Sequence, residues 1–197
     1  MKIVIIFVIL LFLPKFLNAE TYYENYGKIV LKGSRFSGEP VNTSSGKDFG
    51  VLEINPKLNV EHNNIDLNLE LIIKKISSKR DVFYDIKEAN VNFEKSTWGF
   101  LLGSTEEFWG KTETFNPVDI INSNNYDEGL SKPNKLGEAM IKANREIGIG
   151  DLSIYYLPYF RPNKYPSKKS RLSLPIEVND DEANYVNGAD KNMQQFA

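Results

Sequence analysis

Hydrophobic and polar residues alternate along two adjoining segments of the chain. In VLEINPKLNVEH, which starts at Val51, the apolar residues Leu52, Ile54, Leu58 and Val60 share one parity and the charged or amide side chains the other. The segment IDLNLELIIKK, which starts at Ile65, repeats this pattern. A two-residue period puts the apolar side chains on one face of a β-strand, whereas a helical period would scatter the polar ones around a cylinder. Both segments are therefore predicted to be strands with one apolar and one polar face.

Other segments of similar length carry a less regular alternation. Strands are predicted at Tyr26–Gly33, Val82–Glu94, Thr97–Trp109, Leu136–Glu146 and Asp151–Phe160, with a stub from Gly188 to Ala197. Aromatic residues collect near the ends of these segments. The pattern predicts an all-β fold, an antiparallel up-and-down meander of about eight strands.

The lengths of the strands and of their connections favour a particular architecture. Many of the segments reach about 10 residues or more, as a membrane-spanning strand requires, whereas strands in soluble sheets usually have about 5 or 6. The connections at His62–Asn64, Lys95–Ser96 and Ile147–Gly150 are short. Those from Gly110 to Lys135 and from Arg161 to Asn187 have about 26 residues each. Long loops at one end and tight turns at the other are typical of outer-membrane β-barrels.

The polar faces leave two interpretations open. In a transmembrane barrel the polar residues line a wet interior and the apolar ones face lipid. In a soluble β-sandwich the apolar faces meet in a core and the polar faces contact water. The lengths and turns favour a partial transmembrane barrel that acts as a porin-like passive diffusion channel. The alternative is a secreted sandwich that binds carbohydrate or protein through its long loops.

The N-terminus MKIVIIFVILLFLPKFLNA has the composition of a signal peptide. Lys2 precedes an apolar run from Ile3 to Leu13, and a small residue, Ala19, ends the segment. The run is too short for a membrane helix, which needs roughly 20 apolar residues. Residues 1–19 are thus predicted to be removed on export, and residues 20–197 to form the N-terminal part of an outer-membrane barrel domain.

Charge and cysteine content limit the function classes. The chain has 24 basic and 26 acidic residues, and removal of Lys2 and Lys15 with the signal leaves 22 against 26, a net charge of −4. This balance gives no support for nucleic-acid binding, which needs a basic surface. The chain has no cysteine, so an exported domain would fold without disulfides.

Two stretches carry a family resemblance. FWGKTETFNPVDIIN, from Phe108, and NKLGEAMIKANREIGIGDLSIYYLPYFRP, from Asn134, resemble a family of uncharacterised bacterial outer-membrane proteins with the pattern FWGxTE, VDIIN, KLG and LPxFR. The matching residues are Phe108, Trp109, Gly110, Thr112, Glu113, Val118, Asp119, Ile120, Ile121, Asn122, Lys135, Leu136, Gly137, Leu157, Pro158, Phe160 and Arg161. The resemblance covers roughly residues 82–190. It implies a porin-like barrel in the bacterial outer membrane, with no established catalytic residues.

The end of the chain departs from this pattern. Barrels of this kind usually finish on an aromatic residue, whereas this sequence ends NMQQFA, and the family's members look about twice as long. The alternate positions of GADKNMQQFA make no apolar face. The sequence is therefore interpreted as a fragment that holds about eight strands of a larger barrel.

Candidate functional residues follow from the same alternation. The polar face of the two regular strands is predicted to line an aqueous lumen through Lys57, Asn59, Asp66, Asn68, Glu70 and Lys74. The loop EEFWGKTETFNPVDIIN has three interpretations: a connecting loop, a loop that folds back to shape the pore, or an acid/base pair or cation site made by Glu106, Glu113 and Asp119. Sequence proximity on a loop supplies no set separation of carboxylates, so catalysis is the least favoured.

Other chemistry is weakly supported. The single histidine, His62, lies in a predicted turn, so neither a histidine metal site nor a Ser/His hydrolase is indicated. The acidic run Asn179–Glu182 lacks the ligand spacing of an EF-hand. No nucleotide-binding fingerprint occurs. We expect no enzyme activity, cofactor or metal, and we expect outer-membrane lipid, the barrel-assembly machinery and small solutes as partners.

Overall fold

The fold is known from a computed structural model, which describes residues 21–39, 47–108, 120–128, 133–176, 178 and 194–196. The strands are β1 (Thr21–Arg35), β2 (Asp48–His62), β3 (Ile65–Ile76), β4 (Val82–Lys95), β5 (Trp98–Thr105), β6 (Asn124–Asn125), β7 (Asn134–Lys135), β8 (Glu138–Ile147), β9 (Gly150–Leu157) and β10 (Gln195–Phe196). No helix occurs in these residues, and so none there is long and apolar enough to cross a membrane.

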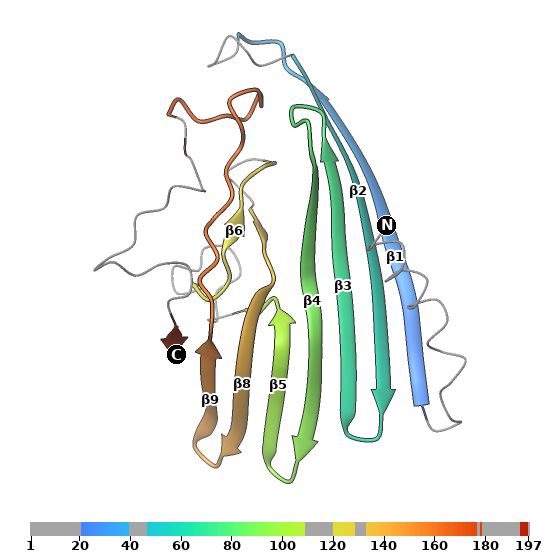
Figure 1. Ribbon diagram of the computed structural model, residues 1–197, viewed down its shortest axis with the longest axis vertical. Helices are drawn as coiled ribbons and strands as arrows, with labels where there is room; N and C mark the ends of the chain where they lie inside the picture. Colours follow the sequence, from blue (N-terminus) through green and yellow to red (C-terminus); the bar gives the residue numbers. More distant parts are fainter. Residues whose placement is uncertain are drawn as a thin grey trace.

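One large sheet dominates the described residues (Figure 1). Its strand order is β1-β2-β3-β4-β5-β8-β9-β10, and every neighbouring pair is antiparallel. The short strands β6 and β7 pair with each other in the connection between β5 and β8. The predicted all-β antiparallel meander is confirmed. The sheet is not closed into a barrel, since β1 and β10 lie at opposite edges and do not pair.

The connections differ between the two ends of the sheet. At the lower end in Figure 1, β2–β3, β4–β5 and β8–β9 are joined by two-residue turns. Asn63 and Ser96 take positive φ angles of 55° and 59° in two of these turns, as tight hairpin turns require. The longer connections lie at the other end. This asymmetry agrees with the predicted short turns.

The pairing registers assign each side chain to a face. Directly paired residues of antiparallel strands point the same way, so a row can be followed across the sheet. One row is Tyr23, Val60, Leu67, Val91, Leu102, Ile141 and Tyr156, and another is Ile65, Phe93, Phe100, Ala143 and Ile154. These rows belong to the outer face. The intervening rows, such as Tyr26, Lys57, Glu70 and Glu88, belong to the inner face.

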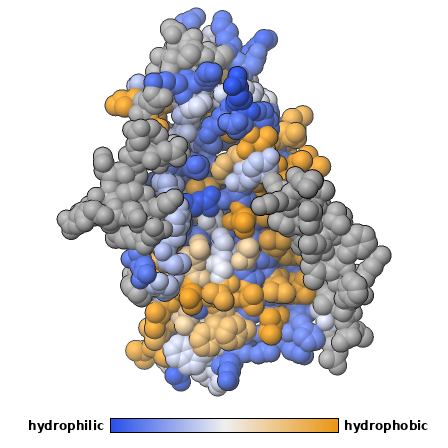
Figure 2. All heavy atoms as spheres, in the orientation of Figure 1, coloured by the Kyte–Doolittle hydropathy of each residue, from blue (hydrophilic) through white to orange (hydrophobic). Residues whose placement is uncertain are grey.

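The outer face is apolar and exposed. In Figure 2 hydrophobic residues gather across the lower half of the sheet, above hydrophilic residues at its lower rim. Ile29 and Leu31 on β1 are 75% and 82% exposed. Phe93, Phe100 and Trp98 form a stacked aromatic group on this face beside the tight turns.

The inner face is covered by segments that connect the strands. We call residues 106–108, 120–128, 133–137 and 158–173 the covering segments. Leu172 packs with Phe36 against the buried inner-face residues Phe49, Val51 and Ile76. Ile121 and Leu101 pack against Met140, Tyr155 and Leu157 nearer the tight turns. The described part of the molecule therefore buries its inner face, where these two apolar clusters lie beside buried polar residues such as Glu70 and Lys74, and leaves its apolar outer face open.

Two glycines permit close approaches within this sheet. Gly103 has a φ of +132°, and a Cβ atom there would lie 2.2 Å from the Ala89 carbonyl oxygen. A Cβ atom on Gly137 would lie 2.2 Å from the Ile86 carbonyl oxygen. Gly137 thus lets the chain pass directly over the backbone of β4 before β8 begins.

Several predicted strand limits were wrong. The strand predicted to reach Trp109 ends at Thr105, because Asn122 supplies the hydrogen bonds that a further strand partner would have made. The strand predicted from Leu136 begins at Glu138, after the close contact at Gly137. The first strand is longer than predicted and runs from Thr21 to Arg35. Most of the predicted stub at 188–197 lies outside the described residues.

Candidate functional site

The candidate site is the polar inner face together with the covering segments. Lysines on four strands of the sheet point inward: Lys32 on β1, Lys57 on β2, Lys74 on β3 and Lys87 on β4; Lys142 on β8 adds a fifth. Carboxylates of the covering segments meet most of them. Ion pairs therefore join the sheet to the covering segments, in addition to the two apolar clusters described above.

The first ionic group lies near the longer connections. Lys74 is 2% exposed, and its Nζ lies 2.6 Å from Glu128 Oε1 and 2.9 Å from Glu53 Oε2. Lys32 reaches the other Glu128 oxygen at 2.7 Å. Beside this group, Lys79 Nζ donates to Asp127 at 2.6 Å. One short segment, Asp127-Glu128, thus contacts lysines of β1, β3 and the β3–β4 turn.

Glu128 is held in its charged form. Burial alone would raise the pKa of this carboxyl, but the hydrogen bonds and charges of Lys32 and Lys74 outweigh burial. Its pKa therefore lies below the ordinary value of 4.5. A buried lysine with two carboxylate partners and a carboxylate with two lysine partners form a satisfied network.

The second ionic group centres on Glu70, which is buried on β3. Lys57 on β2 makes an ion pair with one carboxylate oxygen, and the Asn55 amide donates to the other at 3.0 Å. Lys87 Nζ lies 3.7 Å from Glu70 and 2.6 Å from Glu106 of the covering segments. Glu106 therefore links the covering segments to the centre of the sheet.

The third ionic group links the covering segments to β8 and β9. Lys142 Nζ donates to Glu107 Oε1 at 2.6 Å, and the Tyr155 hydroxyl donates to the same oxygen at 2.9 Å. The consecutive residues Glu106 and Glu107 thus bind lysines on different strands. The segment after β5 crosses the inner face between them.

Asn122 fixes the covering segments to the end of β5. Its Oδ1 accepts from the Glu107 amide, and its Nδ2 donates to the carbonyl oxygens of Thr105 and Leu136, each at 2.8 Å. The side chain is 2% exposed. One side-chain amide thus satisfies three backbone groups where the strand stops, which a buried segment requires.

A polar cavity of about 280 Å³ lies between the sheet and the covering segments. It is lined by Lys28, Glu53, Asn55, Glu70, Ile72, Lys87, Glu106, Pro133, Asn134 and Lys135. Its charged groups carry both signs, so it suits water and small polar solutes.

The six predicted lumen residues lie on the inner face, as the registers place them. Lys57, Glu70 and Lys74 belong to the ionic groups. Asn68 donates to Asn90 of β4 at 3.1 Å, Asn59 is partly exposed, and Asp66 is exposed near a tight turn. Their proposed role in lining a lumen stays a prediction.

The residues of the predicted motif loop have separate positions. Ile121 and Asn122 point into the covered interior, whereas Phe108 and Ile120 are exposed. Trp109, Gly110, Thr112, Glu113, Val118 and Asp119 lie outside the described residues. Glu106 and Glu107 follow directly after β5, and their side chains form ion pairs with Lys87 and Lys142 of the inner face.

Sequence reasoning missed Lys87, Lys142, Glu107 and Glu128 as inner-face partners. Lys87 was hidden because the register between β3 and β4 shifts at Glu70/Leu71, which adds one residue to β4 there. Asp85 and Glu88 are therefore both on the inner face despite their odd spacing. The sequence of β8 contained a signal for Lys142, since this residue shares its parity with Asn144 and Glu146, whereas Ile141 and Ala143 occupy the other parity.

The described residues show no group of three His, Cys, Asp or Glu side chains arranged to hold a metal. His62 Nδ1 lies 2.9 Å from Thr21 Oγ1 and its Nε2 lies 3.0 Å from Asn63 Nδ2, so both ring nitrogens have polar neighbours beside the turn. The acidic run Asn179–Glu182 lies outside the described residues.

Comparisons with protein-family models, curated proteins and solved structures found no match. The resemblance to outer-membrane proteins therefore stays a prediction.

Proposed function

We propose that the chain forms part of the wall of an outer-membrane β-barrel and that this barrel is a porin-like passive diffusion channel. The observation that carries the proposal is the orientation of the sheet. Its apolar face is open, and its polar face is covered and charged. A soluble protein rarely leaves so large an apolar face exposed, whereas a lipid-facing wall requires one.

The distribution of charge on the outer face supports this proposal. In the described strands, charged side chains occur on this face only near its ends: Arg35, Asp48 and Lys75 beside the longer connections, and Lys95 and Arg145 beside the tight turns. Between them the face carries no charge. Arg145 lies over the Trp98 ring, 5.4 Å from its centroid, as expected of a residue at a membrane interface.

The height of the uncharged band fits a bilayer. Phe93 near the tight turns and Tyr84 near the other end pair with Ile65 and Ile73, which are eight residues apart on β3. At about 3.3 Å per residue this is roughly 26 Å along the strand, or about 20 Å along the axis of a barrel whose strands tilt by about 40°. Outer-membrane barrels carry an apolar band of about 25 Å between aromatic girdles.

In this proposal the covering segments narrow the lumen. Glu106, Glu107 and Glu128 bind wall lysines, so they would leave a passage with charges of both signs. Such a passage favours small polar solutes and gives weak ion selectivity. Of the three interpretations of the loop after β5, the inward ion pairs favour the one in which it shapes the pore.

Fractionation and conductance test the proposal. We expect the chain in detergent-soluble outer membrane, and we expect ion conductance after the complete barrel, of which it forms part, is reconstituted into planar bilayers. Recovery from the periplasm or medium would instead support the secreted sandwich. A membrane-inserted chain without conductance would reject the channel but keep the barrel.

A charge reversal sharpens the conductance test. Lys28→Glu changes a lysine that lines the polar cavity, so the reversal potential should move toward cation selectivity. Lys95→Glu is the matched control, because Lys95 is exposed at the outer rim. Equal shifts for both variants would contradict the proposed lumen.

A further inference from the structure

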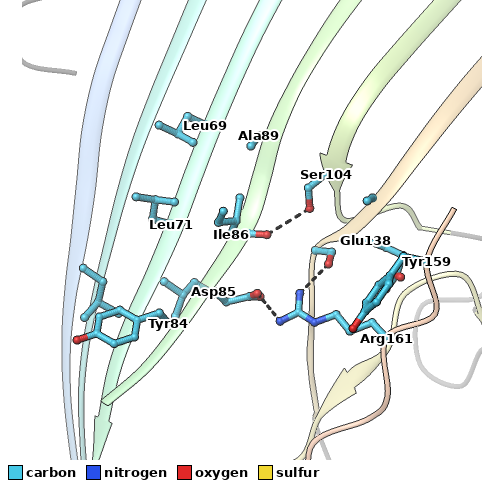
Figure 3. A pocket seen from close by; sticks show the side chains of 14 residues that line it. Leu69, Leu71, Tyr84, Asp85, Ile86, Ala89, Ser104, Glu138, Tyr159 and Arg161 are labelled. Carbon is cyan, nitrogen blue, oxygen red and sulfur yellow. Dashed lines mark hydrogen bonds and ion pairs between the residues drawn. The ribbon is translucent and has the colours of Figure 1, made fainter. Parts of the chain in front are cut away.

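An apolar cavity of about 740 Å³ opens on the outer face, away from the covered ionic groups (Figure 3). Its apolar walls include outer-face side chains of β3 and β4, among them Leu69, Leu71, Tyr84 and Ile86. Its volume is within the range of sites that hold small organic ligands, about 300–1,000 Å³.

The cavity exists because strand pairing is interrupted at this place. β4 pairs with β5 only from Ala89 to Lys95, so its first half, from Val82 to Glu88, has no strand partner on that side among the described residues. The chain re-enters beside it at Gly137, whose missing side chain allows contact with the Ile86 carbonyl oxygen. The sheet therefore has a lateral gap with apolar walls.

The inner end of this gap is polar and buried. Arg161 reaches in from the segment after β9, and its guanidinium lies between Asp85 and Glu138 (Figure 3). Its Nη2 donates to Asp85 Oδ1 at 2.6 Å, and its Nη1 donates to the Gly137 carbonyl oxygen at 2.8 Å. The charged residues of the lining are Asp85, Glu138 and Arg161.

Arg161 does not provide a hydrogen bond to every oxygen atom of Asp85 and Glu138. Asp85 is 6% exposed and Glu138 3%, yet Asp85 Oδ2 and Glu138 Oε2 have no hydrogen-bond partner in the described part of the chain. Two carboxyl groups and one guanidinium thus leave hydrogen-bond acceptors without donors at the polar end. Buried acceptors without donors are costly, so a ligand that donates hydrogen bonds here would stabilise the site.

We propose that this gap binds an amphiphile whose alkyl chain lies along the apolar walls of β3 and β4 and whose ammonium head donates to Asp85 and Glu138. The charge of the site selects the head group. An anionic head would add a like charge beside the two carboxylates, and a quaternary ammonium would neutralise charge without donating a hydrogen bond.

The proposed ligand enters from the side of the wall rather than through the lumen. The gap opens on the apolar outer face, where a lipid-facing wall would meet acyl chains. This binding site does not depend on ion conductance. Loss of the channel proposal would leave it intact, and loss of binding would leave the channel proposal intact.

The test measures binding of three probes that share one alkyl chain. The full chain is purified in maltoside micelles and titrated with dodecylammonium, dodecyltrimethylammonium or dodecanoate, and bound probe is counted by native mass spectrometry. We expect dodecylammonium to bind about tenfold more tightly than the quaternary probe, because only it donates hydrogen bonds to the buried carboxylates. Dodecanoate should bind most weakly. Equal affinities for the three probes would overturn the proposal.

Two kinds of variant locate the site. Ala139→Trp fills the gap and should abolish binding, whereas Ala143→Trp, on the same face of β8 but outside the cavity, should not. Asp85→Asn and Glu138→Gln should remove the preference for dodecylammonium over the quaternary probe. If Ala139→Trp fails to fold, these two isosteric variants still decide. Unchanged discrimination in both of them would refute the proposed head-group contacts.

Discussion

The two faces of the sheet differ in composition and in what covers them. On the outer face, Ile29, Leu31 and Ile154 are exposed, with no segment over them in the described structure. On the inner face, Glu70, Lys74 and Asn90 are buried, and Lys74 contacts Glu128 from a distant part of the chain. A soluble sheet shows the reverse arrangement, because apolar side chains are more stable away from water.

In this molecule, therefore, the burial of a residue does not follow from its hydrophobicity. The inner face is ordered by ion pairs and amide hydrogen bonds, each of which must find its partner. The outer face makes no such demands, since apolar contacts are not directional. Contact with hydrocarbon would stabilise the outer face, whereas the inner face is stabilised by its own partners.

The largest effect is expected from a charge on the outer face. Leu58→Arg places a cation in the middle of the uncharged band and should destabilise the membrane-inserted chain by about 2–4 kcal/mol. Asn59→Arg is the matched control, because the neighbouring residue points to the inner face. Unfolding in lipid vesicles by denaturant measures both. Equal costs would show that the two faces do not differ as proposed.

A smaller effect is expected from loss of the amide that anchors the cover. Asn122→Ala removes hydrogen bonds to Thr105, Glu107 and Leu136 and leaves buried backbone groups unpaired, at a cost of about 1–3 kcal/mol. Hydrogen exchange should increase in the covering segments but not in β2 and β3. Ile120→Ala, at an exposed neighbour, should change neither region. Faster exchange throughout the sheet would contradict a local role.

The smallest effect is expected from acid. Because Lys32 and Lys74 depress the pKa of Glu128, its stabilising contribution is fully present above the ordinary value of 4.5 and is lost as pH falls through the lower folded value. We expect a loss of about 1 kcal/mol in protection of residues 126–128, measured by hydrogen exchange. Glu128→Gln should already show the acid behaviour at neutral pH. A variant with the wild-type pH dependence would exclude this carboxyl as the cause.

Much of the wall could be predicted from the sequence. The alternation around Leu58 and Asn59 depends only on the two-residue repeat of a strand, so it assigned both faces of β2 and β3 correctly. The tight turns at Asn63 and Ser96 also followed from short polar connections between apolar runs. These features are local, and local physics determines them.

The covering segments could not be predicted in the same way. Lys32 and Glu128 are separated by 96 residues, and Asp85 and Arg161 by 76. No spacing rule relates charges so far apart, and their pairing depends on the assembled sheet. The register shift beside Glu70 had a similar effect, because one additional residue in β4 reversed the parity and concealed Lys87.

The ion pairs of Glu128 have a consequence for the order of assembly. This carboxylate joins Lys32 of β1 to Lys74 of β3, while Glu107 of the same connection binds Lys142 of β8. These lysines come together only after the strands between them have paired, and such distant contacts form slowly. We therefore expect the covering segments to dock on the inner face after the strands of the sheet have paired.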